Sequence, residues 1–416
     1  MTRPTLVIVG AGLGASQLCA SLAEGRAKLP ADAPPAPDWR VIVIGEEAHL
    51  PYHRPPLSKA LLKDPAATVQ ALRGEAFYEQ GGVELRLGWR AIGIDRTTHQ
   101  LTLQPAQGGP FTTLAYDHLV IATGAAARRL PDVPAGLPGV HVLRDADHAL
   151  NLRSALNATR HLAVIGGGFI GLEAAATARA LGKTVTVLEA APRLLPRAVS
   201  PALSARLLGL HREAGLDIRL DAVLKGVRID AGRFAGLELE GDVVPADTLL
   251  VGIGAVPNTR LAEAAGLPCE NGIRVDSHLL SADPAISAIG DCCNFPAGGE
   301  RRRLESVQNA QDQAKVVAAR LLGQPEPYTA MPWFWSDQGT ARLQMTGLWR
   351  PGLDTVERPG KAPGAASWLH FDGDRLVAVE SLNAPADQIA ARKLMQAGRS
   401  PARAAAADPA QPLVAG

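Results

Sequence analysis

Two glycine-rich turns carry the residues with the clearest chemistry in this sequence. At the second, an apolar run at 162–165 leads into GGGFIG at 166–171, an alanine-rich stretch follows, and a β-branched run at 184–188 ends at Glu189. Strand, glycine turn, helix, strand and acid in this order form a dinucleotide-binding fingerprint, in which backbone N–H groups at the helix N-terminus receive a pyrophosphate. The sequence therefore predicts a dinucleotide site that includes Gly166, Gly168, Phe169, Ile170, Gly171 and Glu189.

The same pattern occurs once before, at the N-terminus. A β-branched run at 5–9 leads into GAGLGA, with Gly10, Gly12, Gly14 and Ala15 at the positions of the fingerprint, and a helix is expected at 16–24. The next strand, at 40–44, is followed by Glu46. A Pro/Ala-rich linker at 25–38 pushes this acid beyond the usual spacing of about 20 residues, which a surface loop tolerates at small entropic cost. A protein with two such units most simply holds two dinucleotides and passes electrons between them, so we interpret the first as an FAD site and the second as a nicotinamide site.

Composition limits the remaining possibilities. The 416 residues suffice for two or three domains, and a formal net charge of +1 gives no reason to expect a nucleic-acid or membrane partner. The sequence has no apolar run of membrane-spanning length and no secretory signal, so we expect a cytoplasmic protein. Four cysteines without a CxxC pair suit a reducing compartment and predict neither a structural disulfide nor a metal site.

Several further segments have patterns that suggest structure. From the residues alone, Ser58 is expected to cap a helix and Lys59 to be an exposed lysine at its start. Strands that end in small-residue turns are expected at 117–124 and at 247–254, and Asp291 follows another strand, where it suits either a polyol hydroxyl or an ordinary strand-end cap. A helix is expected at 305–322 and a small antiparallel sheet at 331–380, whereas the tail after residue 397 has no pattern that predicts structure.

The order of the motifs matches a known family. GxGxxA, RPPLSK, ATG, VIGGGFIGLE, GIGAVPN, AIGD, ESVQNA and PWFWSDQ occur in this order over nearly the whole chain. The sequence resembles the FAD-dependent NAD(P)H ferredoxin reductases of the glutathione-reductase-like superfamily, among them the reductase components of biphenyl-type dioxygenases. The resemblance implies an α/β fold with two Rossmann-like dinucleotide-binding domains and a C-terminal α+β domain. The implied boundaries are 1–125 with 249–326 for the FAD domain, 126–248 for the NAD domain and 327–416 for the C-terminal domain.

The resemblance also implies roles for individual residues. Lys59 and Glu173 match a pair that meets beside the flavin N5, which reverses the interpretation of Lys59 as an exposed lysine, and Trp335 matches an aromatic residue that flanks the flavin ring. We therefore expect Lys59, Glu173 and Trp335 to be catalytic and Gly254 to join the nicotinamide site. The implied FAD contacts are Gly10, Gly12, Gly14, Ala15, Glu46, Arg54, Lys59, Ala91, Ala122, Thr123, Gly124, Arg144, Asp291, Val307 and Trp335.

The implied activity is electron transfer from NADH through FAD to an outside acceptor. Disulfide reductases of this superfamily carry CxxxxC where this chain has RPPLSK, so electrons have no dithiol to reduce and must leave directly. Glu189 favours NADH over NADPH, although Arg193 is close enough in the sequence to offset part of that preference. The expected partner of the monomeric protein is an acidic [2Fe–2S] ferredoxin that serves a P450 or a Rieske-type oxygenase. Its docking face would involve Arg301, Arg302, Arg303 and Arg342, unless these arginines only form a solvated surface.

Two alternatives remain open at this stage. A reductase of the same architecture could instead serve rubredoxin, nitrite reductase or a quinone, and the sequence does not separate these acceptors. Relatives that resemble apoptosis-inducing factor share RPPLSK but act as redox sensors through a long-lived reduced complex.

Overall fold

The computed structural model describes residues 3–28 and 36–416, which form two compact units. Unit 1 comprises Met1–His53, Val69–Ala126 and Ala255–Ala330, and unit 2 comprises Arg54–Thr68, Ala127–Gly254 and Met331–Gly416. The middle of the predicted linker, 29–35, lies outside the described residues. Each unit is built around a parallel sheet whose central strand leads into a glycine turn.

The sheet of unit 1 has five parallel strands in the order β19–β7–β1–β2–β3. Its central strands are β-branched and apolar because they are buried on both faces, as expected for a parallel sheet. The bounds of its strands are β1 (Thr5–Val9), β2 (Arg40–Gly45), β3 (Val83–Leu87), β7 (His118–Ile121) and β19 (Ile286–Ala288).

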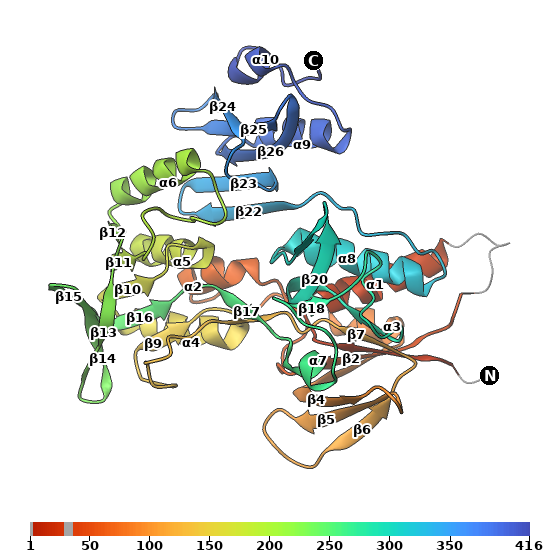
Figure 1. Cartoon of the computed structure of the whole chain (residues 1–416). Coiled ribbons are helices and arrows are strands. Elements are labelled where there is room, and N and C mark those ends of the chain that lie inside the picture. The colour runs from red at the N-terminus through yellow and green to blue at the C-terminus, as the bar shows by residue number, and fades with distance from the viewer. Residues whose placement is uncertain (1–2, 29–35) are drawn as a thin grey trace. The chain divides into compact units, whose positions relative to one another are not determined.

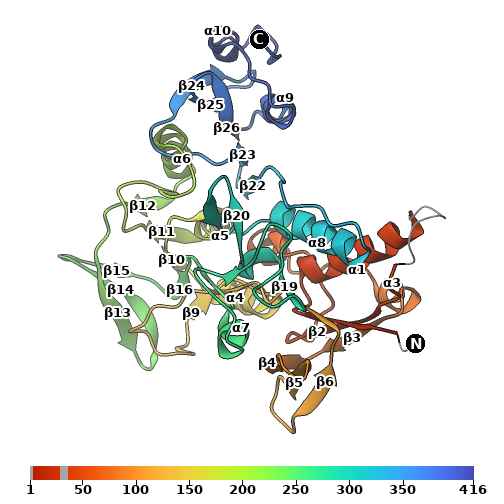
Figure 2. The ribbon, with the colours of Figure 1, turned by 45° about the vertical axis from the view of Figure 1, so that its right-hand side comes forward.

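Two long helices of unit 1, α1 (Leu13–Ala27) and α8 (Val307–Leu321), pack against each other. Figures 1 and 2 show them on one side of the parallel sheet and an antiparallel sheet, β4–β5–β6, on the other. The helix α1 extends to Ala27, three residues into the predicted linker. The remaining elements of unit 1 are β4 (Trp89–Asp95), β5 (Gln100–Pro105), β6 (Thr112–Ala115), α3 (Glu75–Gln80), α7 (Arg260–Ala264), β18 (Ile273–Arg274), η2 (Gly290–Cys292), β20 (Cys293–Ala297) and β21 (Glu300–Arg302).

Unit 2 has a second parallel sheet, in the order β12–β11–β10–β16–β9. The helix α5 follows the second glycine turn and packs on β10 and β11. An antiparallel sheet, β13–β14–β15, completes this part. The elements are η1 (Pro55–Ser58), α2 (Ala60–Lys63), β9 (Val140–Val142), α4 (Ala146–Ala158), β10 (His161–Ile165), α5 (Phe169–Ala180), β11 (Thr184–Leu188), α6 (Pro201–Glu213), β12 (Asp217–Arg219), β13 (Leu224–Asp230), β14 (Arg233–Leu239), β15 (Asp242–Pro245) and β16 (Thr248–Val251). Two short strands, β8 (Ala125–Ala127) and β17 (Ala255–Pro257), lie where the chain passes between the units.

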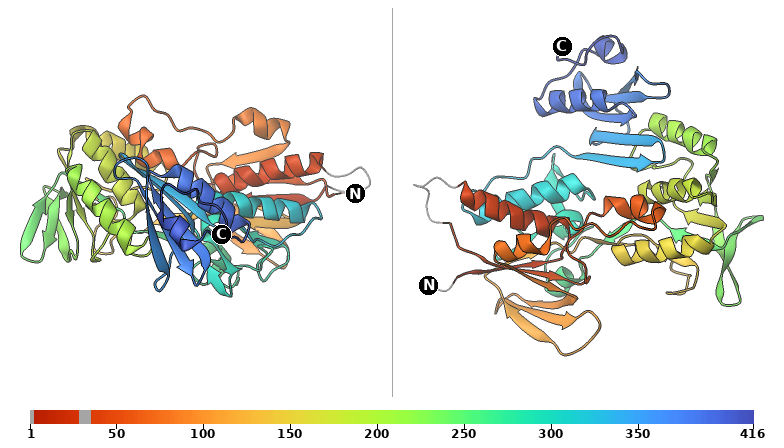
Figure 3. Two further views of the ribbon diagram at one scale, coloured as in Figure 1. Left: turned by 90° about the horizontal axis from the view of Figure 1, so that it is seen from above. Right: turned by 180° about the vertical axis from the view of Figure 1, so that it is seen from behind.

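The C-terminal part of unit 2 is an antiparallel sheet in the order β22–β23–β26–β25–β24. Figure 3 shows β22 and β23 beside α6, with the helices α9 and α10 farther along the chain. The bounds are β22 (Trp333–Gln338), β23 (Ala341–Gly347), β24 (Asp354–Pro359), β25 (Ala366–Asp372), β26 (Arg375–Leu382), α9 (Pro385–Gln396) and α10 (Arg403–Ala407).

The expectation that the tail after residue 397 has no structure is wrong. The tail contains α10 and wraps around the buried side chain of Arg358, whose guanidinium donates hydrogen bonds to the carbonyls of Ala405, Asp408 and Gln411. Because these acceptors are backbone groups, no pattern of side chains in the tail could have indicated them.

The expected α/β fold with two Rossmann-like halves and a C-terminal α+β part is confirmed. Among residues 3–28 and 36–416, no helix combines the length and the apolar character that a membrane crossing requires.

His118, at the start of β7, is a buried histidine inside unit 1. Its Nε2 lies 3.0 Å from the hydroxyl of Ser287, and its ring meets the edge of Trp39. Burial, with a smaller contribution from the positive charge of Arg320, lowers the pKa of His118 to about 3.

This lowered pKa makes the stability of the protein pH-dependent. Below the ordinary histidine pKa of about 6.5, the unfolded chain binds a proton that folded His118 excludes until about pH 3, so stability falls as the pH drops through this range. From pH 6.5 to pH 5.5 this one group should cost about 1 kcal/mol. In urea unfolding at these two pH values, His118→Gln should lose about that much of the pH dependence, and an identical pH dependence in both proteins would contradict the assignment.

Candidate functional site

The first glycine turn joins β1 to α1 in unit 1. Gly10 has a φ of +111°, and a Cβ atom there would lie 2.2 Å from the carbonyl oxygen of Ala122, so only glycine fits. Ala15 is fully buried and lets α1 pack closely, and a Cβ on Gly14 would press on Ile289 at 3.2 Å. These residues are required by the protein's own packing.

Gly12 differs from its neighbours because the fold does not require a glycine there. Its φ is −101°, and an added Cβ would meet none of the described residues within 4 Å. As the N-cap of α1, Gly12 also has no side chain that could occupy the first N–H groups of the helix. An open cradle at a helix N-terminus fits the pyrophosphate of a dinucleotide.

Two predicted motifs meet beside this turn. The hydroxyl of Thr123 donates to the carbonyl of Asn258 at 2.8 Å, and the amide of Asn258 donates to the carbonyl of Thr123 at 2.8 Å. The backbone N–H of Asn258 donates to the carbonyl of Gly124, whose φ is +67°. The turn of Ala122, Thr123 and Gly124 is therefore held in place by the VPN segment.

The other residues of unit 1 predicted to contact FAD lie at strand and helix ends. Glu46 follows β2 and pairs with Arg90 at 2.6 Å, and Ala91 is the next residue on β4. Asp291 lies in η2, which packs against α8, and Val307 is the first residue of that helix. Arg54, Lys59, Arg144 and Trp335 belong to unit 2, where Arg54 donates to the carbonyl of Arg144 at 2.6 Å.

The second glycine turn, in unit 2, repeats the design of the first. A Cβ on Gly166 would lie 2.4 Å from the carbonyl oxygen of Gly252, and one on Gly171 would lie 2.3 Å from that of Gly166. At Gly168 the nearest atom would be 3.8 Å away, an ordinary contact, so this glycine too leaves space that the protein does not fill. Beside it Ile170 is 45% exposed, although it is apolar.

Glu189 lies at the end of β11, next to the second turn. Its carboxylate accepts hydrogen bonds from the N–H of Gly167 at 2.7 Å and from the N–H of Ala191 at 2.8 Å, which fixes the side chain at the edge of the turn. Arg193 is engaged elsewhere, because its guanidinium donates to the carbonyls of Val199 and Pro196 and covers the ring of Trp349. Gly254, with a φ of +96°, follows β16 in the same unit.

Lys59 and Glu173, predicted to form a pair, do so within unit 2. The Lys59 Nζ lies 2.6 Å from Glu173 Oε2, and the side chains are 25% and 5% exposed. Lys59 also donates to the carbonyl of Pro55 at 3.1 Å. Lys59 is thus a held ammonium group and not an exposed lysine at a helix start.

Two serines that hold the same carboxylate were missed or misinterpreted. Ser58 does not cap a helix, since its hydroxyl is directed to Glu173 Oε2, and Ser336 donates to Glu173 Oε1 at 2.7 Å. Ser336 lies in the PWFWSDQ motif, two residues from Phe334 on the strand β22. The alternation of side chains along this strand was the available signal, because it places both residues on one face.

The strand β22 separates two groups of aromatic side chains. Trp333 and Trp335 stack with 5.4 Å between ring centroids, and the guanidinium of Arg392 lies 5.3 Å from the centroid of the Trp333 ring. On the opposite face of the strand, the ring of Phe334 contacts the ring of Phe169, with 4.7 Å between the ring centroids. Phe169, predicted to bind the nicotinamide cofactor, therefore touches the C-terminal sheet.

Two of the arginines predicted to dock a partner have internal roles. Arg301 donates to the carbonyls of Val275 and Asn294, and Arg303 donates to the carbonyl of Asp291. Arg342 is 61% exposed, with Asp337 at 3.8 Å. Arg342 is thus better placed than Arg301 or Arg303 to meet a partner.

The cysteines take no part in either turn. All four are free, and Cys292 and Cys293 are fully buried. Burial raises the pKa of both these thiols, which keeps them protonated and unreactive. They act as small buried side chains, as expected from the sequence.

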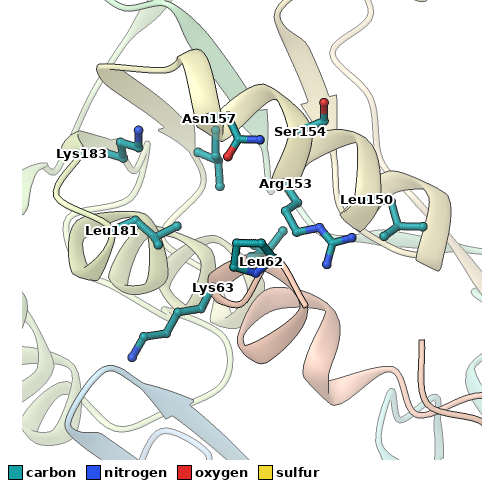
Figure 4. Close-up of a pocket in the computed structure, with 10 residues that line it drawn as sticks. Leu62, Lys63, Leu150, Arg153, Ser154, Asn157, Leu181 and Lys183 are labelled. Atoms are coloured by element: carbon teal, nitrogen blue, oxygen red, sulfur yellow. The ribbon is translucent and has the colours of Figure 1, made fainter. Parts of the chain in front are cut away.

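A basic pocket lies in unit 2, apart from the predicted site residues. Figure 4 shows Lys63, Arg153 and Lys183 on its wall, between α2, α4 and the end of α5. Arg153 donates to the carbonyls of Leu61, Asp64 and Ala67, so its guanidinium ties α4 to the α2 segment.

Comparison with known proteins shows what the chain is similar to. Residues 4–314 match the family described as pyridine nucleotide-disulphide oxidoreductase, and residues 333–415 match the reductase C-terminal family. Rhodocoxin reductase of Rhodococcus erythropolis is 46% identical over 360 residues, which cover 85% of this chain and 83% of that protein. The ferredoxin–NAD(+) reductase component of the anthranilate 1,2-dioxygenase system of Burkholderia cepacia is 41% identical over 414 residues, which cover 98% of each chain. Among solved structures, a covalent putidaredoxin reductase–putidaredoxin complex is similar with a TM-score of 0.87 and 35% identity, over 96% of this chain and 94% of that chain.

The two open glycines predict separable effects on the two nucleotides. A methyl group at either position would clash with a bound nucleotide but not with the protein. The clash should cost roughly 1–3 kcal/mol of binding free energy, which is about tenfold in affinity. Gly12→Ala should fold but bind FAD about tenfold more weakly. Gly168→Ala should retain FAD, while its KM for the nicotinamide nucleotide rises about tenfold.

Gly209, inside α6, offers a matched control, since an added Cβ there also meets none of the described residues within 4 Å. Gly209→Ala should leave both affinities unchanged. FAD titration of the apoprotein and steady-state kinetics measure the two effects. Wild-type FAD affinity in Gly12→Ala would show that the first turn does not hold a pyrophosphate.

Proposed function

The chain belongs to the pyridine nucleotide-disulphide oxidoreductase family, and on that premise we propose that it is the ferredoxin reductase of an oxygenase system. It transfers electrons from a nicotinamide nucleotide through FAD to a small iron–sulfur ferredoxin. Two relatives that match over nearly the whole chain support this proposal. One is named as the ferredoxin–NAD(+) reductase component of a dioxygenase system, and the other is a putidaredoxin reductase in complex with putidaredoxin. The oxygenase that receives the electrons is a P450 or a Rieske-type enzyme.

The observation that carries the proposal is the ion pair between the partly buried Lys59, which ends the segment RPPLSK, and the buried Glu173 on α5. Disulfide reductases of the superfamily hold two cysteines at this place, whereas this segment holds an ammonium group and no sulfur. An enzyme without a dithiol has to pass its electrons directly to an external acceptor.

The two glycine turns suit two dinucleotides. FAD, when bound, would supply the redox chemistry, which is hydride acceptance from a nicotinamide and electron transfer to an iron–sulfur acceptor. We assign the FAD domain to 1–125 and 249–326, the NAD domain to 126–248 and the C-terminal domain to 327–416. The turn at Gly10–Ala15 and Ala122–Gly124 would hold FAD together with Glu46, Arg54, Ala91, Arg144, Asp291 and Val307.

The residues assigned to catalysis act by charge and position. The ammonium group of Lys59 favours the electron-rich state of the flavin electrostatically, and Glu173 keeps Lys59 in one place. Such fixed charges cost no reorganisation at the moment of transfer. Trp335 would flank the flavin ring, as the resemblance implies.

The preferred nucleotide is NADH. Glu189 would accept a hydrogen bond from the ribose 2′-hydroxyl of NAD, whereas it would repel a 2′-phosphate by roughly 4 kcal/mol at about 4 Å and an effective dielectric constant near 20. Arg193 does not relieve that repulsion, because its guanidinium is bonded to two backbone carbonyls.

The partner is an acidic [2Fe–2S] ferredoxin, and the reductase is a cytoplasmic monomer. The exposed Arg342 and the Arg392 guanidinium over Trp333 supply positive charge on the C-terminal sheet for such a partner. The four free cysteines suit a reducing compartment.

A change at Glu189 tests the coenzyme preference. Glu189→Gln keeps the length of the side chain and removes its charge, so the ratio of kcat/KM for NADH to that for NADPH should fall at least about tenfold. Stopped-flow reduction of the bound flavin by each nucleotide gives this ratio. If the ratio is the same in the variant and the wild type, Glu189 does not select the nucleotide.

The function itself is tested by a panel of acceptors. The purified, FAD-loaded protein should reduce cytochrome c with NADH only when a [2Fe–2S] ferredoxin is added, and rubredoxin or a quinone should not replace it. A stable reduced complex that does not turn over with any ferredoxin would indicate a redox sensor instead.

A substitution tests the role of Lys59. In Lys59→Met, flavin reduction should slow by roughly a hundredfold with FAD still bound. Lys63 is an exposed lysine four residues away, and Lys63→Met should match the wild type.

A further inference from the structure

A buried chain of polar side chains extends from Glu173 far beyond the ion pair. The hydroxyl of Ser336, which is fully buried, donates to Glu173 Oε1, and Gln338 Nε2 donates to the Ser336 oxygen at 3.1 Å. Gln338 is 2% exposed, and its Oε1 lies 2.7 Å from Nε2 of His211, which is 3% exposed on α6. All these groups belong to unit 2.

The donor and acceptor roles along this chain follow from its chemistry. Burial lowers the pKa of His211, so the ring is neutral at pH 7 and carries one N–H. The Gln338 amide nitrogen is directed to Ser336, so its carbonyl oxygen accepts and His211 Nε2 must donate. Every hydrogen bond from His211 to Ser336 therefore points toward the Glu173 carboxylate.

This common direction determines how the Glu173 carboxylate is held. A buried carboxylate is stable only when donors surround it, and aligned hydrogen bonds strengthen one another in a medium of low dielectric constant. Lys59 and Ser58 supply donors to Oε2, while Ser336 donates to Oε1. Without Ser336 the oxygen Oε1 would lose this donor, and the carboxylate could turn away from Lys59.

We propose that Ser336 and Gln338 are positioning residues for electron transfer, which hold the Glu173 carboxylate in one orientation so that Lys59 stays in one place. This inference rests on the proposed role of Lys59 in the ferredoxin reductase. It assigns a purpose to the second half of the PWFWSDQ motif, in which Ser336 and Gln338 lie on the face of β22 opposite to the two tryptophans.

The test is the Ser336→Ala variant, measured in the FAD-loaded protein per bound flavin. The rate constant of flavin reduction by NADH should fall about tenfold, as expected for a lost hydrogen bond to a charged group. Ser336→Thr, which restores the hydroxyl, should recover most of the rate. Ser381→Ala, which removes another buried serine hydroxyl of the same sheet, should leave the rate unchanged.

A double variant separates positioning from a general loss of structure. In the Lys59→Met background, Ser336→Ala should have no further effect on the rate, because the group that it positions is gone. If the double variant instead shows the product of the two single fold-changes in the rate constant, the proposal is wrong. If Ser336→Ala does not fold, Gln338→Met removes the next donor of the chain and is expected to act in the same direction.

Chemical labelling gives a measurement that does not depend on activity. Acetylation of Lys59 by an amine reagent, quantified by mass spectrometry with Lys183 as internal reference, should be several-fold faster in Ser336→Ala than in the wild type. Unchanged labelling together with an unchanged rate of flavin reduction would refute the role of Ser336. Failure of the wild type to reduce any ferredoxin would count against the proposed function alone, because the labelling result still reports on the Ser336–Glu173–Lys59 contacts.

Discussion

The burial of one carboxylate, that of Glu173, is the constraint that links η1, α5 and β22 of unit 2. A charge only 4% exposed is tolerated when hydrogen-bond donors replace the water it has lost. Those donors come from η1, through Ser58 and Lys59, and from β22, through Ser336. Segments that are more than a hundred residues apart along the chain are thus joined by hydrogen bonds to a single carboxylate. The same contacts that satisfy Glu173 leave the Lys59 ammonium group with little freedom to move.

The glycines of the two turns are present for two different physical reasons. Gly10 and Gly166 are required by the protein itself, because a Cβ atom would run into a neighbouring carbonyl oxygen. Gly12 and Gly168 face space that the protein leaves free, which is why we propose that their lack of a side chain serves a ligand. The distinction separates the glycines that the fold requires from those that a bound nucleotide would require. It also explains why the turns in the two units look alike although they are expected to hold different nucleotides.

The chain shows how a family named for disulfide chemistry can work without it. The segment RPPLSK of this protein contains no cysteine, and its vicinal cysteines, Cys292 and Cys293, are buried, with their pKa values raised by that burial. The parallel sheets and glycine turns are retained because they bind nucleotides, which both kinds of enzyme need.

The sequence by itself determined the features that depend on neighbours along the chain. The strands Thr5–Val9 and Thr184–Leu188 and the two glycine turns follow from β-branched runs and from backbone that only glycine can adopt, so they could be predicted to the residue. The pairing of Lys59 with Glu173 was predicted only through a resemblance, since 114 residues separate them. The tertiary structure alone decided that Ser58 serves a carboxylate, that His211 ends a buried polar chain and that the tail folds around Arg358. Each of these depends on contacts between distant segments, and a hydrogen bond to a distant partner leaves no periodic pattern in the sequence from which it could be predicted.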